Sequence, residues 1–154
     1  PVEMPKKYIL CYILGERKCI GRYAEELSIR KGLPVYYIMT RPSTCVYKNV
    51  LKGIGVSEFL WLIENCQYLI TDSFHGTIFA INFHKNMIAY DKHEGEVFDN
   101  GRIEDVLTQF GIKEHYFTSE EYVEPAYIDY DKVECVLNSM RKSSMEYINK
   151  IIDY

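Results

Sequence analysis

Apolar residues along the chain gather in short runs that are separated by more polar stretches. Residues 8–14, 35–39, 68–71 and 86–90 form runs that are almost continuously apolar and show no alternation with polar residues. Such runs are typical of strands that are buried on both faces of a parallel sheet. We therefore predict four buried strands, followed by a last short strand over residues 115–117.

Helices are predicted between the strands, most of them from apolar residues spaced three and four positions apart. They are expected over residues 19–31, 57–65, 77–83, 103–110 and 131–152. Ser57 is placed to cap the second helix, and Asp131 and Glu134 have the spacing of a capping box in the last helix. Alternating strands and helices predict a three-layer, Rossmann-like α/β sandwich with a mostly parallel sheet, here as one domain over residues 1–154.

Composition and charge exclude several classes of protein. The 154 residues are 47% apolar and 26% charged, which is typical of a soluble globular domain and not of a disordered chain. The net charge of −4 argues against binding to nucleic acid through bulk charge. No apolar run reaches the roughly 18 residues of a transmembrane helix, and no signal peptide is visible. We expect a cytoplasmic protein, with the inner face of the membrane as an alternative location.

The cysteines and the first residues of the chain lead to two further expectations. Five cysteines at wide spacing, without a CxxC pair, argue against a disulfide framework or a zinc site, and no metal or cofactor is expected. Cys11, Cys66 and Cys135 lie in apolar patterns and are expected to be packed as small hydrophobic residues. The chain begins at Pro1 and enters a strand within eight residues. This start indicates a piece of a longer protein or a processed chain rather than a natural start.

Candidate chemistry lies in the turns that follow strands, because ligands of parallel α/β sheets bind beyond the carboxyl ends of the strands. The turn over residues 72–76 carries the most information, and its candidate residues are Asp72, Ser73, His75, Gly76 and Thr77. Backbone N–H groups at the start of the following helix would attract phosphate or carboxylate. The alternative reading is structural: Asp and Ser before a helix are ordinary caps, and an imidazole often binds a backbone carbonyl.

Two other turns offer positive charge. The polar loop over residues 91–102 contains Lys92, His93 and Arg102, which are either anion ligands or solvated loop charges. The turn over residues 15–18 contains Arg17 and Lys18 but matches no phosphate-binding fingerprint. His84 and His115 are isolated in the sequence, and both are expected at the surface.

The segment from residue 55 to residue 90 resembles the core of the polysaccharide pyruvyl transferase family. The resemblance rests on a Gly-x-x-Glu-Phe helix start, an apolar strand and the element Thr-Asp-Ser-Phe-His-Gly-Thr, followed by an apolar helix and strand. Gly101-Arg102-Ile103 and the short helix that ends at Gly111 are similar to later segments of that family. Some members carry a basic residue where this chain has Ser73.

The resemblance implies a fold, an activity and partners. It implies the C-terminal half of a two-domain GT-B-like enzyme, with an N-terminal domain elsewhere in the same protein. Members transfer pyruvyl from phosphoenolpyruvate to two hydroxyls of a cell-surface glycan and form a cyclic ketal, without a metal. The motif histidine corresponds to His75, as proton donor or phosphate ligand. Backbone N–H groups, Arg102 and Lys92 or His93 would hold the phosphate.

Two other functions remain open from the residues. One is the nucleotide-sugar half of an ordinary GT-B glycosyltransferase, which requires a carboxylate that grips ribose hydroxyls. The other is a non-enzymatic flavodoxin-like module, which predicts no anion site at residues 72–76.

Overall fold

The computed structural model of the chain describes residues 3–15, 18–40, 46–90, 101–118 and 121–152. The strands are β1 (Ile9–Ile13), β2 (Val35–Met39), β3 (Tyr68–Thr71), β4 (Asn86–Tyr90) and β5 (Tyr116–Phe117). The helices are α1 (Lys18–Lys31), α2 (Val56–Asn65), α3 (Phe74–Asn82), α4 (Gly101–Gln109) and α5 (Tyr130–Ile152), with a 3₁₀ turn η1 (Lys113–His115) before β5.

The strands form one sheet in the order β2-β1-β3-β4-β5, and every pair of neighbours is parallel. Leu10 in β1 lies opposite Tyr36 in β2 and Leu69 in β3, which sets the register at the centre of the sheet. The three inner strands are almost entirely buried, because helices cover both faces. The predicted parallel α/β architecture is therefore confirmed.

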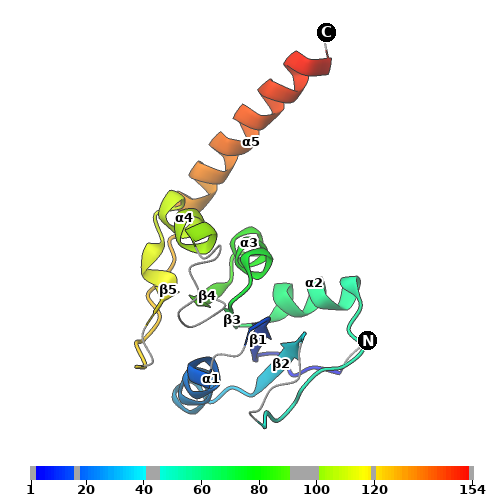
Figure 1. Cartoon of the computed structure of the whole chain (residues 1–154), viewed down its shortest axis with the longest axis vertical. Coiled ribbons are helices and arrows are strands. Elements are labelled where there is room, and N and C mark those ends of the chain that lie inside the picture. Colours follow the sequence, from blue (N-terminus) through cyan, green and yellow to red (C-terminus); the bar gives the residue numbers. More distant parts are fainter. Residues whose placement is uncertain (1–2, 16–17, 41–45, 91–100, 119–120, 153–154) are drawn as a thin grey trace.

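Successive residues of a strand point to opposite faces, so each inner strand serves two separate cores. Ile9 and Ile70 pack on the face that α1 covers. Leu10 and Leu69 pack on the face that α2 and α3 cover, together with α4 and the beginning of α5. Figure 1 shows this layering, with α1 on one side of the sheet and α2 and α3 on the other. The continuous apolar runs in the sequence are the consequence of these two cores.

The ends of three helices differ from the expectation. Gly55, not Ser57, is the N-cap of α2, and Ser57 is an exposed residue of the helix. Helix α3 begins at Phe74, three residues earlier than expected, because Ser73 caps it. No capping box forms at Asp131, because Glu134 binds His84 and the amide of Lys132 donates instead to the carboxylate of Asp129.

The second half of α5 extends away from the sheet (Figure 1). Val133 is buried against the core, whereas Met140, Ile148 and Ile151 of the same apolar stripe are 37%, 44% and 57% exposed. Cys135 is also exposed, which corrects the expectation that it packs as a core residue, while Cys11 and Cys66 are buried. No helix within the described ranges is both long enough and apolar enough to span a bilayer.

His115 lies in the interior, which corrects its expected place at the surface. It is completely buried at the end of η1, and its Nδ1 lies 2.9 Å from the carbonyl oxygen of Met87 in β4. Its Nε2 is buried without a hydrogen-bond partner. The imidazole links η1 to β4, and the sequence around His115 does not predict that contact. His84 is half-exposed, as expected, and its Nε2 lies 2.9 Å from Glu134 Oε1.

Candidate active site at the carboxyl edge of the sheet

The sheet reverses its winding between β1 and β3. From β1 the chain passes through α1 to β2 at one side, and from β3 it passes through α3 to β4 at the other side. The carboxyl ends of β1 and β3 are neighbours, and the chain leaves them in opposite directions. In open α/β sheets ligands bind at such a switch point. The turn at residues 72–76 follows β3 and therefore lies at this switch point.

Asp72 fastens this turn to the end of β1. Its two carboxylate oxygens each accept a hydrogen bond of 2.7 Å, one from the amide of Leu14 and one from the amide of Gly15. The side chain is only 2% exposed. The neighbouring Thr71 donates its hydroxyl to the carbonyl oxygen of Tyr12 at 2.7 Å. Thr71, at the end of β3, thus binds β1 itself, and Asp72, directly after β3, binds the two residues that follow β1, so the two turns at the edge form one unit.

Ser73 and Thr77 shape the first turn of α3. The Ser73 hydroxyl accepts from the amide of Gly76 at 3.3 Å, and the Thr77 hydroxyl donates to the carbonyl oxygen of Ser73 at 3.0 Å. The first amides of a helix have no acceptor within the helix. Because Ser73 satisfies the amide of Gly76, the N–H groups of Phe74 and His75 are the donors that this N-terminus offers to an anion.

Gly76 allows α3 to approach the sheet closely. A Cβ atom at this position would lie 2.7 Å from Thr71 Oγ1 and 3.1 Å from Tyr12 Cδ1. The glycine therefore makes room for the strand side chains beneath the helix, in addition to any backbone approach to a ligand. This contact holds the N-terminus of α3 directly over the ends of β1 and β3.

His75 and Arg102 present ionisable groups beside this N-terminus. His75 is exposed in the first turn of α3, so its imidazole is open to a ligand. The guanidinium carbon of Arg102, in the first turn of α4, lies 5.2 Å from the ring centroid of Phe74. The imidazole of His75 lies edge-on to the same phenyl ring at 5.8 Å. The Phe74 ring thus contacts both a guanidinium from α4 and an imidazole from α3.

The structure separates the candidate residues into two groups. Asp72, Ser73, Gly76 and Thr77 are buried and build the turn, whereas His75 and Arg102 are exposed at its surface. Lys92, His93 and Arg17 lie outside the described residues. In the ranges that are described, no group of three or more His, Cys, Asp or Glu side chains is placed to hold a metal ion.

Sequence reasoning missed the residues that connect these parts. The amides of Leu14 and Gly15 and the ring of Phe74 carry no chemical signal of their own in the sequence. The adjacency of β1 and β3 would have pointed to the two amides, since an acidic residue directly after one strand can reach the end of its neighbour. The local sequence pattern does not determine strand order, so the contact between Asp72 and these two amides is evident only in the folded chain.

The fold and this edge define an α/β protein with a helix N-terminus at the switch point of a parallel sheet. Residues 2–93 match the family model described as polysaccharide pyruvyl transferase, which spans more than half of the chain. The chain therefore belongs to the polysaccharide pyruvyl transferase family, and the resemblance seen in the sequence is confirmed.

Other comparisons are distant. No curated protein sequence is significantly similar to the chain. Among solved structures, the chain is similar to a UDP-GlcNAc 2-epimerase of Methanocaldococcus jannaschii, solved in complex with UDP-GlcNAc and UDP, with a TM-score of 0.45 and 12% identity. The match covers 89% of this chain and 46% of the epimerase chain. The chain thus spans less than half the length of that structure.

Proposed function

We propose that this chain binds phosphoenolpyruvate at the edge between β1 and β3 and takes part in the transfer of its pyruvyl group to two hydroxyls of a glycan. The observation that carries the proposal is the exposed His75 in the first turn of α3, with Arg102 against the neighbouring Phe74 ring, in a chain of this family. Phosphoenolpyruvate has a phosphate and a carboxylate, and the edge offers donors for both.

The proposed reaction needs a proton donor and fixed positive potential. One glycan hydroxyl adds to C2 of phosphoenolpyruvate while C3 takes up a proton and becomes a methyl group. The second hydroxyl then displaces phosphate from C2 and closes the ketal. Of the two hydroxyl protons, one balances the proton taken up at C3 and the other leaves with phosphate. We assign the donation at C3 to His75, since imidazole exchanges protons near neutral pH.

The amides of Phe74 and His75 and the guanidinium of Arg102 would hold the phosphate. Two contacts support this role: Ser73 caps the helix, and the Phe74 ring lies against Arg102. A site that is ordered in advance spends little free energy on reorganisation when charge develops. In this proposal Asp72, Ser73, Gly76 and Thr77 act by holding the turn in place. The glycan acceptor and a further domain of the same protein are the proposed partners.

Binding of phosphoenolpyruvate to the 154-residue chain tests the proposal directly. Isothermal titration calorimetry should show saturable binding, and Arg102→Ala should weaken it about tenfold or more, as expected for a lost charge-assisted contact. Arg141→Ala is the matched control, because Arg141 is an exposed arginine on α5. Binding of UDP-sugars without binding of phosphoenolpyruvate would instead favour a nucleotide-sugar enzyme.

The role of His75 requires a turnover measurement in the active enzyme that contains this chain. His75→Ala should lower the rate by roughly 10²-fold or more while binding of phosphoenolpyruvate is largely retained. His84→Ala, two residues beyond the C-terminal end of α3, is the control and should leave the rate unchanged. Unchanged turnover in His75→Ala would remove this residue from the mechanism.

A further inference from the structure

A second site is suggested by an open cavity of about 400 Å³ at the other side of the domain. It is lined by α1, by β2 and by the segment 46–49 that runs beside β2. That segment is attached to the sheet through backbone hydrogen bonds. The amide of Tyr37 donates to the carbonyl oxygen of Asn49, and the carbonyl oxygen of Tyr37 accepts from the amide of Leu51. The volume lies within the range of roughly 300–1,000 Å³ that is typical of small-molecule sites.

One wall of the cavity is aromatic and is held in place. The rings of Tyr37 and Tyr47 lie 4.4 Å apart between centroids, with an interplanar angle of 35°. Tyr37 is buried, whereas Tyr47 is partly exposed to the cavity. A Cβ atom at Gly21 in α1 would lie 2.7 Å from Cε1 of Tyr47. A glycine inside a helix is unfavourable by roughly 0.5–1 kcal/mol relative to alanine, and here it leaves the space that the Tyr47 ring occupies.

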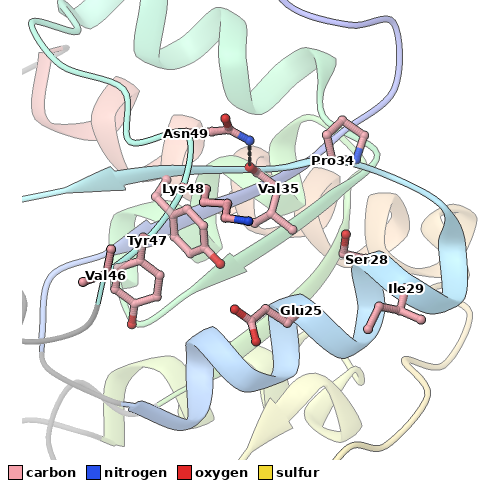
Figure 2. A pocket seen from close by; sticks show the side chains of 10 residues that line it. Glu25, Ser28, Ile29, Pro34, Val35, Val46, Tyr47, Lys48 and Asn49 are labelled. Atoms are coloured by element: carbon pink, nitrogen blue, oxygen red, sulfur yellow. Dashed lines mark hydrogen bonds between the residues drawn. The ribbon is translucent and has the colours of Figure 1, made fainter.

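The opposite parts of the cavity are polar and carry both signs of charge. Figure 2 shows the side chains of Glu25, from α1, and Lys48, from the segment 46–49, directed toward the opening from opposite walls. The amide nitrogen of Asn49 donates to the carbonyl oxygen of Val35 at 3.0 Å, which leaves the amide oxygen of Asn49 as an acceptor. Ser28 likewise donates its hydroxyl to the carbonyl of Leu33 and retains acceptor capacity.

These features favour a neutral ligand with several hydroxyl groups. The carboxylate of Glu25 would repel a phosphate, and the lone ammonium of Lys48 is balanced by that carboxylate. A hydroxyl group can both donate and accept a hydrogen bond. It can donate to the Glu25 carboxylate or to the free acceptor oxygens of Asn49 and Ser28, and it can accept from the Lys48 ammonium. The aromatic wall offers an apolar surface for the C–H face of a sugar ring. Aromatic side chains combine such a surface with a polar tip.

We infer that this cavity is a carbohydrate-binding subsite, which holds a sugar unit through the Tyr47 ring and the polar groups of Glu25, Lys48 and Asn49. It is separate from the edge at α3, because β1 lies between β2 and β3 and the cavity opens beside β2. A sugar bound here does not react. Its role as an anchor for the acceptor glycan rests on the proposed function, whereas binding of the sugar itself does not.

Methyl glycosides of glucose, galactose, mannose and N-acetylglucosamine are suitable probes for the 154-residue chain. NMR titration should show weak, saturable binding of at least one of them, with little dependence on salt, since the ligand is uncharged. Tyr47→Ala should weaken that binding about tenfold or more. Gly21→Ala should also weaken it, because the added methyl group displaces the ring without removing it. Thermal unfolding of each variant reports whether the fold is intact.

Tyr127→Ala is the matched control, because Tyr127 is an 85% exposed tyrosine outside the cavity. It should leave glycoside binding unchanged. Failure of all four glycosides to bind, or full binding by a folded Tyr47→Ala chain, would overturn the inference. Titration of the original chain with phosphoenolpyruvate separates the two sites. Glycoside binding without phosphoenolpyruvate binding argues against the proposed function, and phosphoenolpyruvate binding without glycoside binding argues against this subsite.

Discussion

The carboxylate of Asp72 and the amide of Gly15 are joined by a hydrogen bond of 2.7 Å across the junction of β1 and β3. The other carboxylate oxygen binds the amide of Leu14 at the same distance. Gly15 lies 57 positions before Asp72 in the chain, and Leu14 lies 58 positions before it. The bond pair explains why the end of β1 and the first turn of α3 are fixed relative to each other.

Asp72→Asn should lower the free energy of unfolding by about 1–3 kcal/mol. The new side-chain NH₂ would face the amide of Leu14 or Gly15, so one buried donor loses its acceptor. Urea denaturation measures the loss, and amide hydrogen exchange should show faster exchange at the two backbone positions. Asp105→Asn is the control on an exposed part of α4 and should change stability by less than about 0.5 kcal/mol. Equal stability of the two variants would contradict the role of Asp72.

Gly76→Ala should be destabilising by about 1–3 kcal/mol through overpacking. The added methyl group would lie 2.7 Å from Thr71 Oγ1, so α3 must move or the bond from Thr71 to Tyr12 must break. Gly101→Ala is the matched control, because a Cβ atom there would meet Asp105 Oδ2 at an ordinary 3.6 Å. Urea denaturation of both variants gives the comparison, and a neutral effect of Gly76→Ala would show that the contact is easily relieved.

His115→Ala should cost about 2–4 kcal/mol, because it removes a fully buried ring and its bond to Met87. His84→Ala provides a comparison at a half-exposed histidine and should cost less than about 1 kcal/mol. Chemical denaturation near neutral pH measures both. If both variants lost a similar free energy of unfolding, the buried His115 ring and its bond to Met87 would not contribute the expected stability.

Glu124→Gln should change how stability depends on pH. Hydrogen bonds from Lys31 and then Tyr122 lower the pKa of Glu124 in the folded chain. A lowered folded-state pKa means that the stabilisation is fully present above the unfolded-state value of about 4.3 and disappears as the pH falls through the folded-state value. The difference in free energy of unfolding between the original chain and Glu124→Gln should therefore shrink as the pH falls below the unfolded-state pKa and through the folded-state pKa.

Unfolding by urea at neutral pH and at several acidic pH values checks this dependence. Glu146→Gln, on an exposed position of α5, is the control and should show the same pH dependence as the original chain. A difference between Glu124→Gln and the original chain that stays constant down to the lowest pH would show that the ion pair with Lys31 contributes nothing measurable.

The local pattern of residues determined much of this protein. Continuous apolar runs predicted the inner strands, spacing of three and four predicted the helices, and the motif around His75 indicated the family. These features are local, because burial on both faces of a strand or on one face of a helix is expressed within a few residues. The predicted helix ends were less accurate, because residues near Gly55 and Ser73 are of types that cap helices equally well.

Tertiary structure alone decided which of these elements meet. The order of strands brings β1 beside β3, and so brings Asp72 to the amide of Gly15. It brings Arg102 of α4 over the ring of Phe74 and buries His115 against Met87. Each contact joins residues that are distant in the chain, and its energy depends on how two packed surfaces fit. A pattern read along one segment contains no information about that fit.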